Sequence, residues 1–221
     1  MEVRIDQLLK KAAPALTIGA VFATVEVTKH DSALWTEIDS CIAEITTGLT
    51  IGSVSEMPEI KSLRGAYRAL GKDPSRYRGS QEALLRRILQ GKGLFRINTV
   101  VDINNLVSLE SAHSVGCYDI SRIHPPVTFR IGQSGEVYRG IGKETINLEG
   151  LPIFSDATGP FGSPTSDSER AMISLGTKEV MMLVIAFSGA MGLRHYVERA
   201  ATLLSKYAKA KPETVLQDVI T

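Results

Sequence analysis

Segregated helices and strands predict an α+β fold for this chain. Apolar residues recur at helical spacing up to about residue 90, whereas short runs rich in Val, Ile and Phe dominate from about residue 128. The longest apolar run, VMMLVIAF at 180–187, suits a buried strand and is far too short to cross a bilayer. Because helical and strand patterns do not alternate, an α/β fold with a parallel sheet is disfavoured.

The first predicted elements are a helix near residues 4–12, a strand over 16–27 and a helix over 32–46. Asp31 is a suitable N-cap for the third element, in which Leu34, Ile38, Ile42 and Ile45 form one stripe. These elements begin the helix-rich part of the chain, which we expect to extend to about residue 95.

Two basic helices come next, over 58–70 and 80–90. Pro58 occupies the first turn of the first helix and Gly71 ends it. Ser80 is the expected N-cap of the second helix, and Gly91 follows its end.

A strand-rich part is predicted from about residue 96 to 190, with strands at 128–131, 135–138, 153–154 and 179–187. A last helix is expected over about 193–210, with Pro212 beyond its end. Its inward positions are Leu193, Val197, Ala201 and Leu204. With 221 residues, the chain is expected to fold as a single domain over 1–221.

The charges of the chain are strongly asymmetric. Residues 61–96 contain ten Lys or Arg against Asp73 and Glu82, a net charge of +8, whereas the whole chain carries +1 and the remainder therefore −7. Such a patch is typical of a surface that binds phosphates, although solvated helix faces would also carry charge. Arginines beside Tyr77 in the loop between the two basic helices favour RNA, through phosphate contact and base stacking. The candidate RNA-binding residues are Lys61, Arg64, Arg68, Arg76, Arg78, Arg86 and Arg87.

Two polar stretches are candidate pocket rims. The first, NNLVSLESAHSVGCYD at 104–119, contains Asn104, Asn105, His113 and Gly116, and the second, SDATGPFGSPTSDS, spans 155–168. Each residue also has a purely structural interpretation: the asparagines as helix caps, His113 as a surface loop residue, and the aspartates of the second stretch as Asx-turn formers.

Common catalytic and cofactor motifs are absent from the sequence. GIGKET at 140–145 lacks phosphate-loop spacing, and GxGxxG, HExxH and GxSxG do not occur. The 4 histidines and 2 cysteines have no metal or redox spacing, so we expect neither metal nor cofactor. A Ser-His-Asp triad is neither indicated nor excluded. The N-terminus lacks a continuous apolar segment, so a reduced, cytoplasmic protein without membrane contact is expected.

Five ordered blocks resemble the editing domain of the bacterial phenylalanyl-tRNA synthetase beta subunit, in its free-standing form. They are RYRGSQEALLRRIL, RINTVVDINNLVSLES, GCYDISRI, FRIGQSGEVYRGIG and GLPIFSDATGP, and the resemblance covers roughly residues 15–205. It implies a layered α+β fold with a β-sandwich-like sheet core flanked by helices. It also implies hydrolysis of the ester in a mischarged aminoacyl-tRNA, with the tRNA acceptor end as partner and a transient contact with a synthetase allowed.

The chain departs from the family pattern in its pocket. Asn104 stands where the family has a threonine, Gly116 where it has a histidine, and Ala157 and Thr158 where it has an acidic residue after the aspartate matched by Asp156. Tyrosine is therefore not the expected substrate side chain, because its hydroxyl would lack its partner. The free-standing forms are associated with non-standard amino acids, including arginine analogues such as canavanine.

For such a hydrolysis we expect the following site residues. Asn104, Asn105, His113 and Asp156 would position water or substrate, with His113 as a candidate general base. Backbone amides near Gly116 and Gly159 would stabilise developing charge. The expected substrate-binding residues are Glu110, Gly116, Tyr118, Thr158, Gly159 and Asp167. Asp156, Asp167 or Glu110 would suit a cationic side chain.

Two other functions remain open. The first alternative is a tRNA- or RNA-binding module without hydrolysis, as the altered pocket positions allow. The second is a hydrolase of a small free amino-acid derivative, whose basic face serves another purpose.

Overall fold

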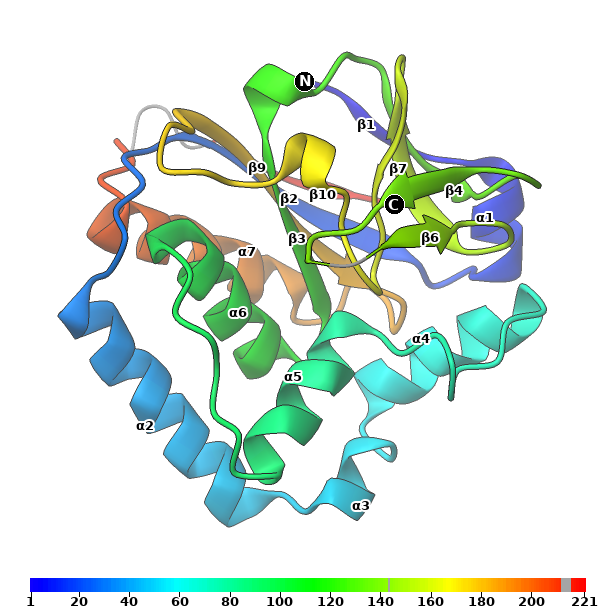
Figure 1. Ribbon diagram of the computed structural model, residues 1–221. Helices are drawn as coiled ribbons and strands as arrows, with labels where there is room; N and C mark the ends of the chain where they lie inside the picture. The colour runs from blue at the N-terminus through cyan, green and yellow to red at the C-terminus, as the bar shows by residue number, and fades with distance from the viewer. Residues whose placement is uncertain (143, 212–215) are drawn as a thin grey trace.

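The computed structural model describes residues 1–142, 144–211 and 216–221, and in this part of the chain seven α-helices and two short 3-10 helices, Ile120–Arg122 and Glu169–Ala171, accompany two four-stranded sheets (Figure 1). The α-helices are α1 (Gln7–Ala12), α2 (Ser32–Gly48), α3 (Ile51–Val54), α4 (Pro58–Ala69), α5 (Ser80–Leu89), α6 (Thr99–Ser111) and α7 (Leu193–Tyr207). The α+β prediction is confirmed. Pro212 lies outside the described residues.

One sheet is antiparallel, with strand order β10-β2-β9-β3, and the other is mixed, with order β1-β4-β7-β8 and a parallel β1-β4 pair. β5 and β6 form a separate hairpin. The strands are β1 (Val3–Ile5), β2 (Thr17–Thr24), β3 (Ser114–Asp119), β4 (Val127–Ile131), β5 (Val137–Arg139), β6 (Thr145–Asn147), β7 (Pro152–Asp156), β8 (Gly159–Gly162), β9 (Glu179–Ala186) and β10 (Leu216–Ile220).

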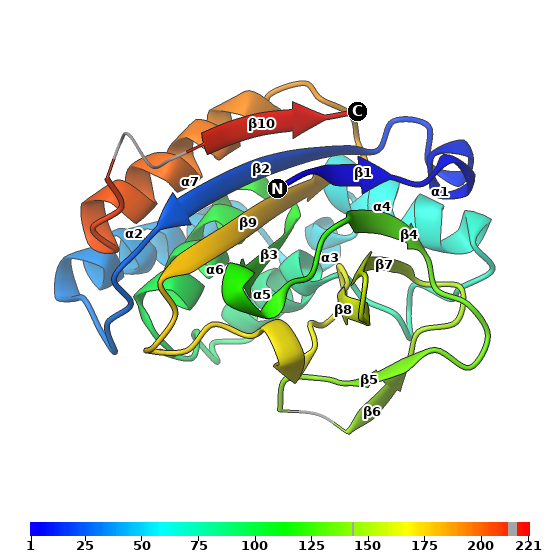
Figure 2. The same cartoon turned by 90° about the horizontal axis from the view of Figure 1, so that it is seen from above.

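The antiparallel sheet is the middle layer of the molecule. Along β9, Leu183 packs toward the mixed sheet and Val184 toward the helices α2, α6 and α7, because successive strand side chains point to opposite faces. This double burial explains why the run at 180–187 is apolar throughout. Figure 2 shows α2, α6 and α7 on one side of the antiparallel sheet and the mixed sheet on the other.

Several helix predictions agree closely with the structure. Asp31 caps α2 by accepting a hydrogen bond from the Leu34 amide, and Pro58 begins α4. The four inward positions predicted for α7 are all buried. At α5 the prediction is wrong by one residue: Gly79 is the N-cap, and Ser80 is the first helical residue.

The N-terminal prediction is only partly right, because the predicted helix near 4–12 divides into β1 and the shorter α1. Asp6 causes the division by capping α1, with its carboxylate accepting from the Leu8 and Leu9 amides. None of the helices in the described residues is long and apolar enough to span a bilayer.

Candidate functional site

The first predicted pocket rim, 104–119, is regular secondary structure and not a loop. Asn98 caps α6 by accepting from the Val101 amide, and the helix ends where Ala112 adopts a left-handed conformation. β3 follows directly. The prediction missed α6 because this segment was assigned to the strand-rich part and its polar side chains to a pocket rim, whereas Val100, Ile103, Leu106 and Val107 bury its apolar side.

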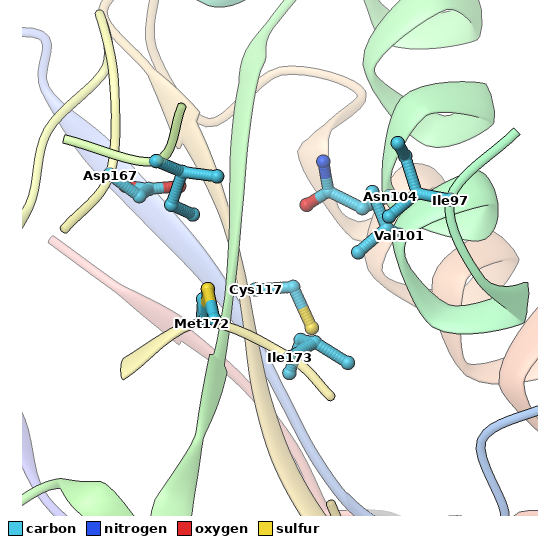
Figure 3. Close-up of a pocket in the computed structure, with 8 residues that line it drawn as sticks. Ile97, Val101, Asn104, Cys117, Asp167, Met172 and Ile173 are labelled. Atoms are coloured by element: carbon cyan, nitrogen blue, oxygen red, sulfur yellow. The ribbon is translucent and has the colours of Figure 1, made fainter. Parts of the chain in front are cut away.

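A cavity of about 210 Å³ lies between α6, β3 and the chain that follows β8, and we call it the Asn104 pocket. Its walls are mostly apolar, with Asn104 and Asp167 as the polar exceptions. Figure 3 shows these two side chains approaching the pocket from opposite sides. The lining residues are Ile97, Val101, Asn104, Cys117, Ile141, Asp167, Met172 and Ile173.

Asn104 carries an unsatisfied group into this pocket. Its Oδ1 atom is buried and has no hydrogen-bond partner among the described residues. An unpaired buried oxygen of this kind is costly, and a bound water or ligand donor would relieve the cost. The neighbouring Asn105, predicted to share its role, does not line the pocket.

Asp167 is held in place by groups from the sheet and its own loop. Its Oδ1 accepts from the Tyr118 hydroxyl at 2.8 Å and from the Ser163 amide at 3.2 Å. Because two donors fix this carboxylate, it presents a positioned negative charge to a mostly apolar pocket.

Tyr118, predicted to bind substrate, does not line the pocket but donates a hydrogen bond to Asp167, which does. It is 1% exposed, and its ring passes between two glycines. A Cβ added at Gly116 or Gly162 would lie 2.3 or 2.2 Å from the Tyr118 hydroxyl oxygen. Gly116 is therefore needed for the passage of Tyr118, whereas the prediction assigned it to close ligand approach.

Cys117 and the apolar lining residues were not predicted. They come from four separate segments around 97–101, 117, 141 and 172–173, so no local spacing marks them as neighbours. Burial raises the pKa of the Cys117 thiol, and the nearby Asp167 charge adds to the effect. The thiol is therefore protonated at neutral pH and is not an activated nucleophile.

Asp156, predicted to be catalytic, lies outside the Asn104 pocket and is occupied by internal donors. Arg170 pairs with both of its oxygens, at 2.9 and 3.0 Å. The same carboxylate accepts from the backbone amides of His124, Thr158 and Gly159. These bonds make Asp156 an Asx-turn former, which is the purely structural interpretation of this residue. Thr158 and Gly159 therefore lie at the β7–β8 turn and not in the pocket.

His113 and Glu110 also lie away from the pocket lining. Burial lowers the pKa of His113 to about 4, and its ring contacts that of Tyr196 edge-on. His113 is 5% exposed, so neither the surface-loop interpretation nor the general-base role suits it. Glu110 pairs with Arg199 of α7 at 2.9 Å.

The predicted cationic surface is partly an internal ion-pair cluster. Glu82, only 1% exposed, binds Arg64 through two hydrogen bonds of 2.9 Å. Arg86 and Arg78 approach the same carboxylate at 2.8 and 3.4 Å. Three guanidinium groups therefore share one carboxylate, and the cluster keeps a net positive charge at the surface of α4 and α5.

The other predicted cations differ in how they are held. Arg87 donates to the backbone oxygens of Gly93 and Lys92, and Lys61 pairs with Glu56 at 2.8 Å. Arg68 is exposed, and Arg76 lies in the loop after α4 with 84% of its side chain exposed. Arg68 and Lys61 also line a shallow depression beside Arg64.

No group of three or more His, Cys, Asp or Glu side chains in the described residues is placed to hold a metal ion.

A family model described as the B3/4 domain matches residues 62–209. The phenylalanine–tRNA ligase beta subunit of Chromobacterium violaceum is 31% identical over 67 residues, which are 30% of this chain and 8% of that protein. An N-terminal fragment of the phenylalanyl-tRNA synthetase beta subunit from Pyrococcus horikoshii has a TM-score of 0.48 and 14% identity, over 99% of this chain and 50% of that chain. The chain thus corresponds to only part of each of these proteins.

Proposed function

The chain belongs to the B3/4 domain family, and from this premise we propose that it hydrolyses the ester of mischarged aminoacyl-tRNA in trans. One observation carries the proposal: every residue that lines the Asn104 pocket lies inside the family match at 62–209. The pocket supplies a buried, unpaired acceptor beside a positioned carboxylate. An aminoacyl ester with a cationic side chain offers both a carbonyl to be attacked and a positive charge to be held.

The proposed chemistry needs no covalent intermediate. A water attacks the ester carbonyl, the carbon–oxygen bond to the terminal ribose breaks, and the ribose oxygen takes up a proton. Asn104 orients the water or the ester through its side-chain amide, and apolar walls keep other water away. The ester is already activated, so positioning supplies much of the required rate.

Asp167 is the proposed determinant of the amino acid. Of the three carboxylates predicted to meet a cationic side chain, Asp167 lines the Asn104 pocket, and Asp156 and Glu110 do not. A guanidino or ammonium side chain would form a charge-assisted hydrogen bond with it. This supports tRNA charged with an arginine analogue as the substrate, and tyrosine, which lacks such a charge, as a poor one.

Release of amino acid from a panel of charged tRNAs tests the proposal. The panel includes cognate, near-cognate and non-standard amino acids, with arginine analogues among them. We expect turnover by the wild-type protein and its loss in Asn104→Ala. Asn105→Ala is the matched control, because it removes the same side chain one residue along α6 without touching the pocket lining. Absence of release from every charged tRNA would refute the proposal.

A non-catalytic RNA-binding module is the second candidate, favoured by the position of His113 outside the pocket lining. Both candidates predict tRNA binding that weakens steeply with salt, because bound phosphates release counterions. Only turnover distinguishes them. An affinity for tRNA that does not change with salt concentration would instead favour a hydrolase of small free amino-acid derivatives.

A further inference from the structure

An exposed aromatic residue stands beside the mouth of the Asn104 pocket. The chain between α5 and α6 carries Phe95, which is 64% exposed, and two residues later Ile97, which is 54% exposed and lines the pocket. Because consecutive Cα atoms lie about 3.8 Å apart, the Cα atoms of Phe95 and Ile97 are within about 7 Å of each other. Phe95 therefore adds an exposed aromatic ring to the chain next to the lining residue Ile97.

The Phe95 ring is backed by a fixed cation. The guanidinium carbon of Arg87 lies 3.9 Å from the ring centroid. Arg87 also donates to the Gly93 oxygen at 2.8 Å and the Lys92 oxygen at 3.2 Å, so its guanidinium is tied to the same segment. A cation on one face holds the ring in position, while most of the ring remains open to solvent.

The rim of the pocket is also apolar and exposed. Ile141 and Met172 line the pocket and are each 45% exposed, so together with Ile97 they surround it with uncovered hydrocarbon. Exposed apolar surface gathered at a pocket mouth is typical of a binding site. Lys92 and Arg96 flank Phe95 in sequence, which favours an anionic partner over an apolar protein face.

We propose that Phe95, Arg87 and Ile97 form a platform on which the unpaired 3′-terminal nucleobase of an RNA strand stacks. The platform rests on the proposed function, since it places the base outside the pocket while the ester of the same nucleoside enters it. Aromatic rings and guanidinium planes are the groups on which single-stranded bases stack in proteins. The phosphates that precede the terminal nucleoside then lie near Lys92 and Arg96.

The test compares two uncharged tRNAs, one intact and one lacking the terminal adenosine. Fluorescence anisotropy measures the affinity of each for the wild-type protein and for Phe95→Ala and Phe95→Tyr. We expect removal of the terminal adenosine to weaken wild-type binding about tenfold. Phe95→Ala should weaken binding of intact tRNA by a similar factor and abolish the difference between the two tRNAs. Phe95→Tyr should retain it.

Val137→Ala is the matched control, because Val137 is a 51% exposed apolar residue on β5 outside the pocket lining. Equal binding of both tRNAs by the wild-type protein, or a difference that survives Phe95→Ala, would overturn the platform. So would sedimentation showing that Phe95→Ala dissociates a self-associated protein without changing its RNA affinity. Because the assay needs no hydrolysis, its result is independent of whether amino acid is released.

Discussion

The β7–β8 turn and the Asn104 pocket each receive an aspartate from the same polar stretch, 155–168, yet the two carboxylates have different surroundings. Asp156 meets Arg170 and three backbone amides, so internal donors occupy it. Asp167 is fixed by Tyr118 and Ser163 but reaches the lining of a cavity. An acidic residue in a turn-rich stretch therefore indicates function only once its partners are known.

The largest expected effect is the loss of stability in Asp156→Ala. Removing this carboxylate leaves Arg170 and the backbone amides of the turn without their acceptor. Breaking a buried ion pair from one side typically costs about 3 to 5 kcal/mol. Urea unfolding measures the change in the free energy of unfolding. If Asp156→Ala were as stable as the wild-type protein, the structural role given to Asp156 would be wrong.

The pH dependence of stability provides a second readout of the same site. Burial raises the pKa of Asp156, but hydrogen bonds from Arg170 and from the His124 amide outweigh it and lower the pKa to about 2. Since the folded pKa lies below the unfolded value of about 3.9, the contribution is complete above that value and is lost as the pH falls toward 2. Asp156→Ala should lack this acid-dependent loss.

Asp167→Asn should instead impair recognition while preserving the fold. The amide oxygen still accepts from Tyr118 and Ser163, but the negative charge is gone. Because a hydrogen bond to a charged group contributes about 1.5 to 3 kcal/mol, kcat/KM for a tRNA bearing a cationic amino acid should fall about 10- to 100-fold. Substrates with uncharged side chains serve as the control, and an equal loss on both would contradict the assignment.

His113 resembles Asp156 in this comparison, because it is a predicted catalytic residue that is buried outside the pocket lining. Burial lowers its pKa to about 4, below the unfolded value of about 6.5. The unfolded state therefore binds more protons between these values, and stability should fall as the pH drops from 6.5 to 4, by up to about 1.4 kcal/mol per pH unit. Denaturant titrations across this range should show a weaker dependence in His113→Phe.

The kinetic control for His113 is the rate of deacylation at neutral pH. A residue outside the pocket lining should change kcat/KM little when the variant remains folded. A loss of about 100-fold in His113→Phe with intact folding would instead support the general-base role.

The smallest effects are expected at the exposed cations. Arg64 and Arg86 are held by Glu82, whereas Arg68 and Arg76 are exposed to solvent. Arg68→Ala combined with Arg76→Ala should weaken tRNA binding a few-fold and lower the salt slope by about 1 for each phosphate that the variant no longer binds. Arg139→Ala is the control, because Arg139 is 76% exposed on β5, away from α4 and α5. Equal weakening in both variants would indicate a nonspecific charge effect.

Local pattern was sufficient for much of the fold. Caps and apolar stripes predicted the first residues of α2, α4 and α7 and placed their ends within three residues. The double-sided burial of β9 follows from its unbroken apolar run. α6 was missed because Asn104, Asn105 and Ser108 are polar, although Asn98 was available as an N-cap. Ser108 can be buried because its hydroxyl donates to the backbone oxygen of His113. The spacing of residues along a helix does not predict this contact.

The candidate site was predictable only in part. Asn104 and Asp167 were among the expected residues, but so were Asp156, His113 and Glu110, and no spacing separates the two groups. The apolar lining was not predicted at all, since Ile97, Cys117 and Met172 come from segments far apart in sequence.

The amino-acid sequence was enough to establish the helical and strand patterns, the excess of cations at 61–96 and the ordered blocks of a B3/4 domain. It could not assign the two aspartates, because Arg170 and Tyr118 reach them only after the chain has folded. A carboxylate's role depends on which donors surround it and whether a cavity remains beside it. Those partners are long-range, so the folded arrangement alone assigned Asp156 to the turn and Asp167 to the pocket.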